Sequence, residues 1–251
     1  MGIRGWESMF EESMFEESKI GDSSPQVFTD VSADPFVRGL LHRPAHPNGN
    51  GLVLTHGSGS NCQAPLLVAL AEVFADAGFF VLRCDLPYRQ DRSFGPPAPG
   101  EAKRDRAGLK NAVAALKHLA KGRMFLGGHS YGGRQASMLC AELPPEKDPA
   151  AAPDLAAGLL LLSYPLHPPR KPDQLRTQHF FTLRTPSLFV EGTRDPFGSI
   201  AEIEQALKLI PAKTKLMTIE GAGHDLGFKG KSKRGELTGK ILVEFQAFTG
   251  C

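Results

Sequence analysis

A serine flanked by glycines occurs near the middle of the chain, in the sequence Gly-His-Ser-Tyr-Gly at residues 128–132. It follows a short apolar run at residues 123–126 and precedes apolar residues at helical spacing. A serine on a tight turn between a strand and a helix forms a nucleophile elbow, in which only glycine fits two residues before and after the serine. The pattern predicts that Ser130 presents a nucleophilic hydroxyl at the carboxyl end of a strand. The alternative for so short a pattern is an ordinary glycine-rich turn.

A serine hydroxyl is a poor nucleophile near neutral pH, so it needs a histidine to take its proton and a carboxylate to orient that histidine. In a sheet of this kind the partners follow the serine in the order acid, then histidine. The sequence Glu-Gly-Thr-Arg-Asp at residues 191–195 follows one apolar segment, and Gly-Ala-Gly-His-Asp at residues 221–225 follows the next. Both stretches are expected at carboxyl ends of strands, where open α/β sheets bind ligands. We therefore expect His224 as the base and Asp195 as the acid.

Other acids and histidines fit these roles less well. Asp173 and Glu191 are weaker alternatives for the acid, and Asp225 is too close in sequence to His224 to orient its far ring nitrogen. His129 is left out because adjacent side chains on a tight turn point apart. Four more histidines are expected to be structural or exposed: His56, His118, His167 and His179.

Two backbone amides are needed to stabilise a negatively charged oxygen in the transition state. One is expected from Tyr131, at the start of the helix after the serine, where the helix dipole favours negative charge. The other is expected from Ser58, in the glycine-rich sequence His-Gly-Ser-Gly at residues 56–59. A phosphate-binding loop is the competing interpretation of this stretch, but the Gly-Lys-Ser/Thr ending of such loops is missing.

Four arginines are expected near the same edge of the sheet: Arg83, Arg89, Arg92 and Arg134. They either favour an anionic substrate or are ordinary surface residues. The sequence leaves both interpretations open.

Strand-length apolar segments alternate with helical patterns from residue 26 onward. Strands are expected at residues 27–31, 36–41, 52–54, 79–82, 123–126, 158–162, 188–190 and 215–219, the first two as an antiparallel edge. Helices are expected from Pro65, around residues 109–119, after the serine turn, after a capping box of Ser199 and Glu202, and around residues 237–248. This alternation predicts the α/β class, with a mostly parallel sheet and helices on both faces.

The interval between the strands ending near residue 162 and beginning near residue 188 is the usual place for a cap over such a site. Prolines at positions 168, 169 and 172 prevent a helix in its first part, which leaves one possible short helix at residues 173–181. A helix of that length cannot form a cap with its own core. We therefore expect no sizeable cap domain, and an open cleft suited to small soluble substrates.

Composition limits the classes of partner. A formal net charge of +2, with lysines and arginines spread along the 251 residues, indicates no nucleic-acid partner. Four cysteines without metal-ligand spacing indicate thiols in a reducing compartment. No apolar run approaches the ~20 residues of a membrane span, and the N-terminus carries no signal or transit pattern. The expected location is cytoplasmic.

The first 24 residues differ from the rest of the chain. Glu-Ser-Met-Phe-Glu occurs twice in tandem, at residues 7–11 and 12–16, within a segment of six acidic and two basic residues. We favour a disordered tail, with the domain at residues 25–251. An amphipathic helix and a duplicated stretch upstream of the true start are the alternatives.

From about residue 26 onward the chain resembles the α/β-hydrolase superfamily, on the stretches at residues 56–59, 78–83 and 127–134 and around Asp195 and His224. The sequence Ser-Tyr-Pro-Leu-His at residues 163–167 is similar to a dienelactone-hydrolase-like branch that includes a testis-expressed protein and a subunit of a nuclear histone-acetyltransferase complex, the nonspecific-lethal complex. Dienelactone hydrolases proper carry a cysteine where this chain has Ser130, so the resemblance implies no lactone specificity.

Together these residues predict a serine hydrolase that acts on an ester or related acyl bond of a small molecule, without a metal or organic cofactor. One alternative is a non-catalytic scaffold or binding protein with the same fold, which the complex-forming relatives and the acidic repeat favour. Another is an acyltransferase that uses the same three residues. The oligomeric state is left open.

Overall fold

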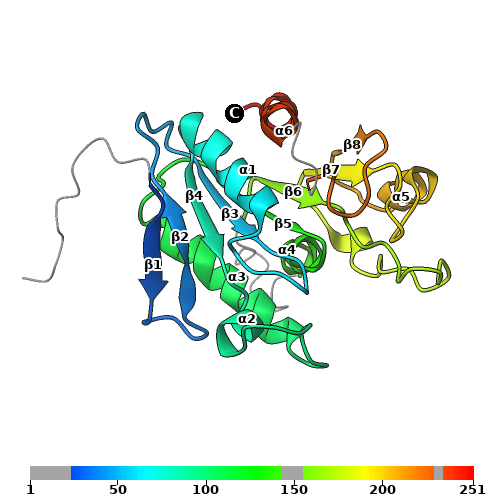
Figure 1. The fold of residues 1–251 in the computed structure, drawn as a ribbon, viewed down its shortest axis with the longest axis horizontal. Helices are drawn as coiled ribbons and strands as arrows, with labels where there is room; N and C mark the ends of the chain where they lie inside the picture. The colour runs from blue at the N-terminus through cyan, green and yellow to red at the C-terminus, as the bar shows by residue number, and fades with distance from the viewer. Residues whose placement is uncertain (1–23, 143–154, 229–233) are drawn as a thin grey trace, which may run out of the picture.

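The computed structural model describes residues 24–142, 155–228 and 234–251. The tail expected at residues 1–24, with its tandem repeat, lies outside the described residues except for Ser24. From Gln26 onward, strands and helices alternate along the chain (Figure 1).

Within the described ranges, eight strands form one sheet in the order β1-β2-β4-β3-β5-β6-β7-β8 (Figure 1). The strands are β1 Gln26–Asp30, β2 Val37–His42, β3 Gly51–Thr55, β4 Phe80–Cys84, β5 Met124–His129, β6 Gly158–Leu162, β7 Ser187–Gly192 and β8 Thr214–Ile219. β2 is antiparallel to both of its neighbours, and all other neighbouring strands are parallel. The expected mostly parallel sheet with an antiparallel edge is confirmed.

Helices cover both faces of this sheet (Figure 1). They are α1 Pro65–Asp76, α2 Pro87–Asp91, α3 Ala102–Lys117, α4 Tyr131–Ala141, α5 Ile200–Leu207 and α6 Arg234–Thr249. α1 and α6 pack together on one face, and α3 and α4 pack together on the other. Each pair covers its own cluster of buried apolar side chains, with Leu67, Phe74 and Phe245 in the first cluster and Leu109, Leu116 and Leu139 in the second.

The burial of the central strands explains their sequences. β3 and β6 are buried along their whole length, because helices exclude water from both faces. A strand in that position has no wet face and therefore shows no alternation of polar and apolar residues. β4 and β5 lie on opposite sides of β3, so the connections after β3 and β5 diverge and leave a crevice at the carboxyl edge.

The connection between β6 and β7 forms no helical cap. The prediction of a short helix at residues 173–181 is wrong. Apart from the 3-10 turn η2 at Phe180–Thr182, this described connection consists of turns and irregular backbone. The amide of Arg176 donates to the carbonyl of Leu166 at 2.8 Å, so it is not available to a helix of its own segment. The chain folds back on itself there and leaves the carboxyl edge of the sheet uncovered by a separate domain.

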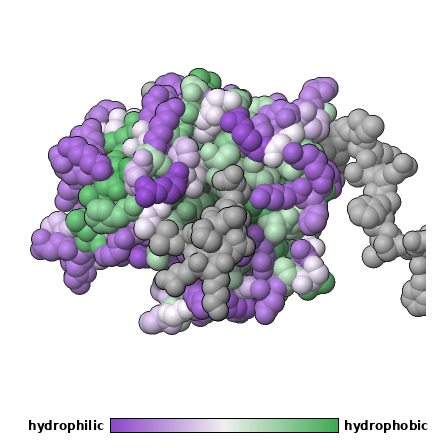
Figure 2. Space-filling model, turned by 180° about the vertical axis from the view of Figure 1, so that it is seen from behind, coloured by the Kyte–Doolittle hydropathy of each residue, from purple (hydrophilic) through white to green (hydrophobic). Residues whose placement is uncertain are grey.

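The surface is predominantly polar on the side turned away from the view in Figure 1, with hydrophobic residues in separate areas (Figure 2). No helix in the described part of the chain has the length and apolar character needed to cross a membrane. All four cysteines are free thiols.

The contact between β2 and β4 gives a direct test of the sheet order. Gly39 pairs with Cys84, and a Cβ at position 39 would overlap the carbonyl oxygen of Arg83. We expect Gly39→Ala to lower the free energy of unfolding by about 1–3 kcal/mol, because the two strands must move apart.

The matched control is Gly239→Ala in α6, where an added Cβ meets no atom within 4 Å. Alanine is preferred to glycine in a helix, so this change should raise stability by roughly 0.5–1 kcal/mol. Urea denaturation measures both variants. An unchanged unfolding midpoint for Gly39→Ala would contradict the pairing of β2 with β4.

Candidate active site

Ser130 joins the end of β5 to the start of α4 with a left-handed backbone, at φ 53° and ψ −116°. A side chain in this region is strained, so the surrounding contacts must hold it there. A Cβ on Gly128 would lie 2.8 Å from the carbonyl carbon of Gly132, and one on Gly132 would lie 2.5 Å from the carbonyl oxygen of His56. The amide of Ser130 donates to the carbonyl of Leu162 at 2.8 Å. The expected strand, tight turn and helix are present, and both glycines are sterically required.

Three side chains from separate segments meet at this turn. Asp195 follows β7, and His224 follows β8. His224 Nε2 lies 2.8 Å from Ser130 Oγ, and His224 Nδ1 lies 2.7 Å from Asp195 Oδ2. The side chain of Asp195 is 1% exposed and that of His224 is 24% exposed. The carboxylate is therefore shielded from water, while the imidazole reaches the accessible surface, where it can exchange a proton with a bound molecule.

Two further residues hold His224. The ring of Phe197 lies against its imidazole, with centroids 4.3 Å apart and planes inclined by 33°. His129 Nε2 lies 2.7 Å from the backbone carbonyl oxygen of His224. Burial lowers the pKa of His129 to about 4, so the ring is neutral near pH 7 and donates an Nε2–H to that carbonyl. His129 lines the same cavity as Ser130 and supports the histidine loop, a role that no sequence signal indicated.

The other candidate acids are placed differently. Glu191 is buried in β7, where it accepts the amide of Tyr164 at 2.7 Å. Burial raises the pKa of Glu191 well above its ordinary value. Asp173 is exposed. Asp225 lines the cavity beside Ser130 and accepts a backbone amide of its own turn at 3.1 Å.

Three of the remaining histidines lie in structural or exposed positions, as expected. His118 is exposed. His179 Nε2 lies 2.8 Å from the hydroxyl of Ser137, and His167 Nδ1 lies 2.8 Å from the carbonyl of Pro168. Over residues 24–142, 155–228 and 234–251, no three His, Cys, Asp or Glu side chains are grouped as metal ligands would be.

Ser58 and Tyr131 both line the cavity at Ser130. Tyr131 is the first residue of α4, where the helix dipole favours negative charge. Its hydroxyl donates to Asp105 at 2.7 Å and is thereby held away from Ser130. In the part of the chain that the structure describes, neither the backbone amide of Ser58 nor that of Tyr131 donates to another residue. Both are therefore available to an oxygen of a bound molecule.

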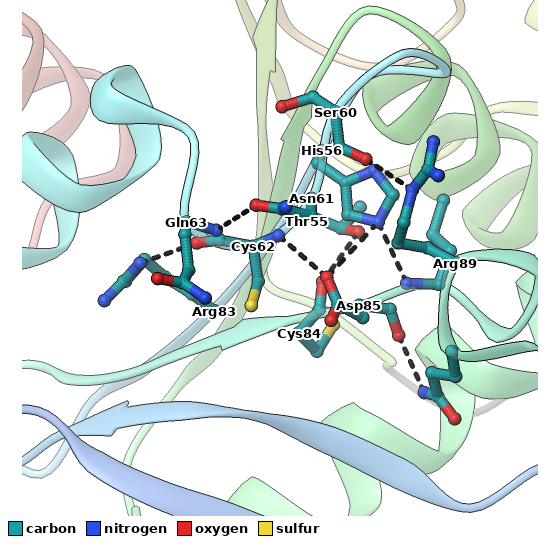
Figure 3. Close-up of polar contacts among 12 residues, drawn as sticks. Thr55, His56, Ser60, Asn61, Cys62, Gln63, Arg83, Cys84, Asp85 and Arg89 are labelled. Atoms are coloured by element: carbon teal, nitrogen blue, oxygen red, sulfur yellow. Dashed lines mark hydrogen bonds and ion pairs between the residues drawn. The ribbon is translucent and has the colours of Figure 1, made fainter. Parts of the chain in front are cut away.

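Arg89 holds the loop after β3 through its contact with the carbonyl of Ser60, which Figure 3 shows, and through further backbone carbonyls. Arg89 Nε donates to the carbonyl of Ser60 at 2.7 Å, and Nη2 donates to the carbonyls of Ser58 at 3.1 Å and Gly95 at 2.8 Å. The hydroxyl of Tyr88 donates to the Ser58 carbonyl at 3.0 Å. With a further hydrogen bond from Nη1 to the carbonyl of Arg92 at 3.2 Å, one rigid guanidinium fixes four carbonyls, and with them the direction of the Ser58 peptide.

His56 and Asp85 fix the two ends of the same loop (Figure 3). His56 Nε2 accepts the amide of Leu86 at 3.1 Å, and its Nδ1 lies 2.9 Å from the carbonyl oxygen of Gly57. Burial lowers the pKa of His56 to about 4, so the ring is neutral and performs both roles. Asp85 Oδ1 accepts the amide of Cys62 at 2.8 Å. These contacts join the loop to the end of β4.

The arginines near this edge have different roles. Arg83 is buried and donates to a histidine and a backbone carbonyl, Arg89 holds the loop, and Arg92 pairs with a glutamate. Of the four arginines expected at this edge, Arg134 lines the cavity. A second lining arginine, Arg176, comes from the connection between β6 and β7 and was not anticipated.

A cavity of about 790 Å³ opens at Ser130. Its apolar lining consists mainly of rigid side chains, namely Pro96, Pro97, Pro165, Pro196 and Phe197. Its polar lining includes the serine, the histidine and the two arginines. This arrangement can bind a small, partly apolar molecule and expose one of its bonds to Ser130.

Residues 48–245 match a family model described as an alpha/beta hydrolase domain. Among solved structures, an alpha-beta serine hydrolase homologue from Coxiella burnetii is similar at a TM-score of 0.67 and 14% identity, over 90% of this chain and 99% of that one. A dienelactone hydrolase from Anabaena variabilis has a TM-score of 0.65 at 21% identity, over 89% and 98%. A serine hydrolase from Xanthomonas campestris, described as lacking a lid, has a TM-score of 0.64 at 14% identity, over 92% and 97%. These likenesses confirm the expected fold.

The Arg89 network predicts a specific effect on the reactivity of Ser130. Lysine keeps the charge but cannot reach four carbonyls at once, so Arg89→Lys should loosen the Ser58 peptide. We expect the rate of Ser130 phosphonylation by a fluorophosphonate probe to fall about 10-fold, less than the 10²–10³-fold loss on removing one such amide donor.

Arg104→Lys is the matched control, because Arg104 is partly exposed and pairs with Asp91 at the surface. Its phosphonylation rate should equal that of the unmodified protein. Equal rates for all three proteins would show that the network does not determine the position of the Ser58 amide.

Proposed function

The chain belongs to the alpha/beta hydrolase domain family, and from this premise we propose that it is a serine hydrolase cleaving an ester or related acyl bond. The observation that carries the proposal is the continuous hydrogen-bond chain from Asp195 through His224 to Ser130. It ends in a hydroxyl held at a strained turn beside a cavity of about 790 Å³. A scaffold has no need of this combination of burial, alignment and strain.

In the first half of the reaction, Ser130 Oγ attacks the acyl carbon while its proton passes to His224 Nε2. Asp195, bound to Nδ1, keeps the imidazole in the tautomer that accepts this proton and stabilises the positive charge that results. The carbonyl oxygen becomes an oxyanion, which accepts hydrogen bonds from the amides of Ser58 and Tyr131. The intermediate then collapses, its bond to the leaving oxygen breaks, and His224 gives the proton to the departing alcohol.

In the second half, water attacks the acyl-Ser130 ester and gives a proton to His224. The second tetrahedral intermediate collapses, releasing the carboxylic acid and returning the proton to Ser130 Oγ. His224 is uncovered enough to exchange protons with water, at 24% exposure of its side chain. No metal or organic cofactor takes part in these steps.

The cavity supports a small soluble substrate rather than a bulk lipid. No helical cap follows β6 in the described connection, and the apolar lining is rich in proline. The sequence Ser-Tyr-Pro-Leu-His at residues 163–167 supports placement in the dienelactone-hydrolase-like branch. The four cysteines without metal-ligand spacing support a cytoplasmic location, and the dispersed lysines and arginines support the absence of a nucleic-acid partner.

The proposed triad predicts strongly non-additive effects. Ser130→Ala and His224→Ala should each lower kcat for 4-nitrophenyl acetate by ~10⁴-fold or more, and the double variant should be little worse than either. Ser93→Ala, at an exposed serine, is the control and should keep full activity. More than about a tenth of the activity in Ser130→Ala would refute the mechanism. A folded unmodified protein that cleaves no ester would favour the binding-protein alternative.

The uncapped cavity predicts a preference for short acyl chains. In a 4-nitrophenyl ester series from acetyl to dodecanoyl, we expect kcat/KM to be highest for the short esters, because no cap adds apolar surface for a long chain and the lining includes four rigid prolines. Rate should rise smoothly with substrate concentration. A jump in rate on an emulsified triglyceride, or a preference for the longest chains, would reveal an acyl tunnel or lid and contradict this part of the proposal.

A further inference from the structure

Arg134 and Arg176 reach the cavity from different parts of the chain. Arg134 is in the first turns of α4, four residues after Ser130, and Arg176 is in the connection between β6 and β7. Both line the same cavity as Ser130 and His224. A molecule bound at Ser130 therefore faces two guanidinium groups.

Neither arginine is neutralised by an acid in the described part of the chain, where no ion pair involves either of them. The Nε atom of Arg134 is buried and has no hydrogen-bond partner there. Arg176 has one side-chain hydrogen bond, from Nη1 to the carbonyl of Pro165 at 3.3 Å. Most of the donor capacity of the pair is thus unused.

The two arginines also lie near enough to affect each other. Burial lowers the pKa of Arg176, and the positive charge of Arg134 lowers it further. No acid of the described ranges offsets this repulsion through an ion pair: Asp225 lines the same cavity but pairs with neither arginine. Two like charges that are partly removed from water, with no acidic side chain of the described ranges paired to either, repel each other unfavourably.

The other arginines of this edge provide a contrast. Arg83, Arg89 and Arg92 direct their donors to carbonyls, a histidine or a carboxylate of the protein itself. Arginine is well suited to bind a carboxylate through two parallel hydrogen bonds. A free carboxylate in the cavity would supply both the missing acceptors and the missing charge.

We propose that Arg134 and Arg176 form a subsite for a carboxylate, so that the substrate of Ser130 is an ester or related acyl compound bearing a second, anionic group. This inference rests on the proposed hydrolase function and specifies its substrate class. The proline and phenylalanine walls contact the short apolar part between the carboxylate and the bond that is cleaved. The carboxylate belongs either to the acyl part or to the leaving group.

The kinetic test compares three 4-nitrophenyl-type esters of similar size. 4-Nitrophenyl butyrate is neutral, mono-4-nitrophenyl glutarate carries the charge on the acyl part, and 3-carboxy-4-nitrophenyl butyrate carries it on the leaving group. We expect kcat/KM for one of the two anionic esters to exceed that of the neutral ester by about 10-fold or more. The anionic ester with the higher kcat/KM shows whether the acyl part or the leaving group faces the arginines.

Arg134→Gln and Arg176→Gln should each lower kcat/KM for the favoured anionic ester by about 10- to 100-fold and change the neutral ester by less than about threefold. Arg184→Gln is the matched control, because it removes the same charge from an exposed position of the same connection. It should leave both esters unchanged. Equal losses for neutral and anionic esters in Arg134→Gln, or no anionic preference in the unmodified protein, would overturn the subsite.

A binding measurement separates the subsite from the hydrolase function. Calorimetry with the Ser130→Ala variant measures the binding of monomethyl glutarate, which carries a carboxylate, without turnover. Adding Arg134→Gln to that variant should abolish this binding. Binding that depends on Arg134, with no ester cleaved by the unmodified protein, would uphold the subsite and refute the hydrolase function. Turnover of the neutral ester, with no binding of monomethyl glutarate that depends on Arg134, would uphold the hydrolase function and refute the subsite.

Discussion

The turn at Ser130 touches the end of β3 so closely that a Cβ on Gly132 would lie 2.5 Å from the carbonyl oxygen of His56 and 2.6 Å from Cγ2 of Thr55. This contact holds the serine in its strained conformation and brings the start of α4 beside the loop after β3. The amides of Ser58 and Tyr131 consequently line one cavity. A bulkier turn would separate these groups, whatever the remaining residues were.

The electrostatics of the site depend on which groups burial keeps neutral. His129 and His56 have pKa values near 4, so both are neutral hydrogen-bonding groups that position loops near pH 7. Burial within β7 likewise disfavours the charged form of Glu191 and raises its pKa. The charged side chains that line the cavity are Arg134, Arg176 and Asp225, and no ion pair of the described residues joins Asp225 to either arginine. The excess of one positive charge supports the proposed carboxylate subsite.

The proximity of Ser130, Asp195 and His224 could be predicted from the sequence alone. Each residue follows an apolar strand, and parallel strands end at one edge of the sheet. The position of Arg176 at the cavity could not be predicted in this way. It depends on a non-helical path of the chain between β6 and β7, which backbone hydrogen bonds fix. The role of Arg89 could not be predicted either, because its acceptors are backbone carbonyls and therefore leave no trace in residue types. The helix expected at residues 173–181 failed for a related reason, as the amide of Arg176 binds the distant carbonyl of Leu166.

The most direct test of Ser130 as an activated nucleophile is to map where a fluorophosphonate probe attaches, by mass spectrometry of the digested protein. We expect one phosphonyl group per chain, on the peptide that contains Ser130, and its loss in the His224→Ala variant. The folded protein without any adduct, or an adduct on another residue, would contradict the claim that Asp195 and His224 activate Ser130.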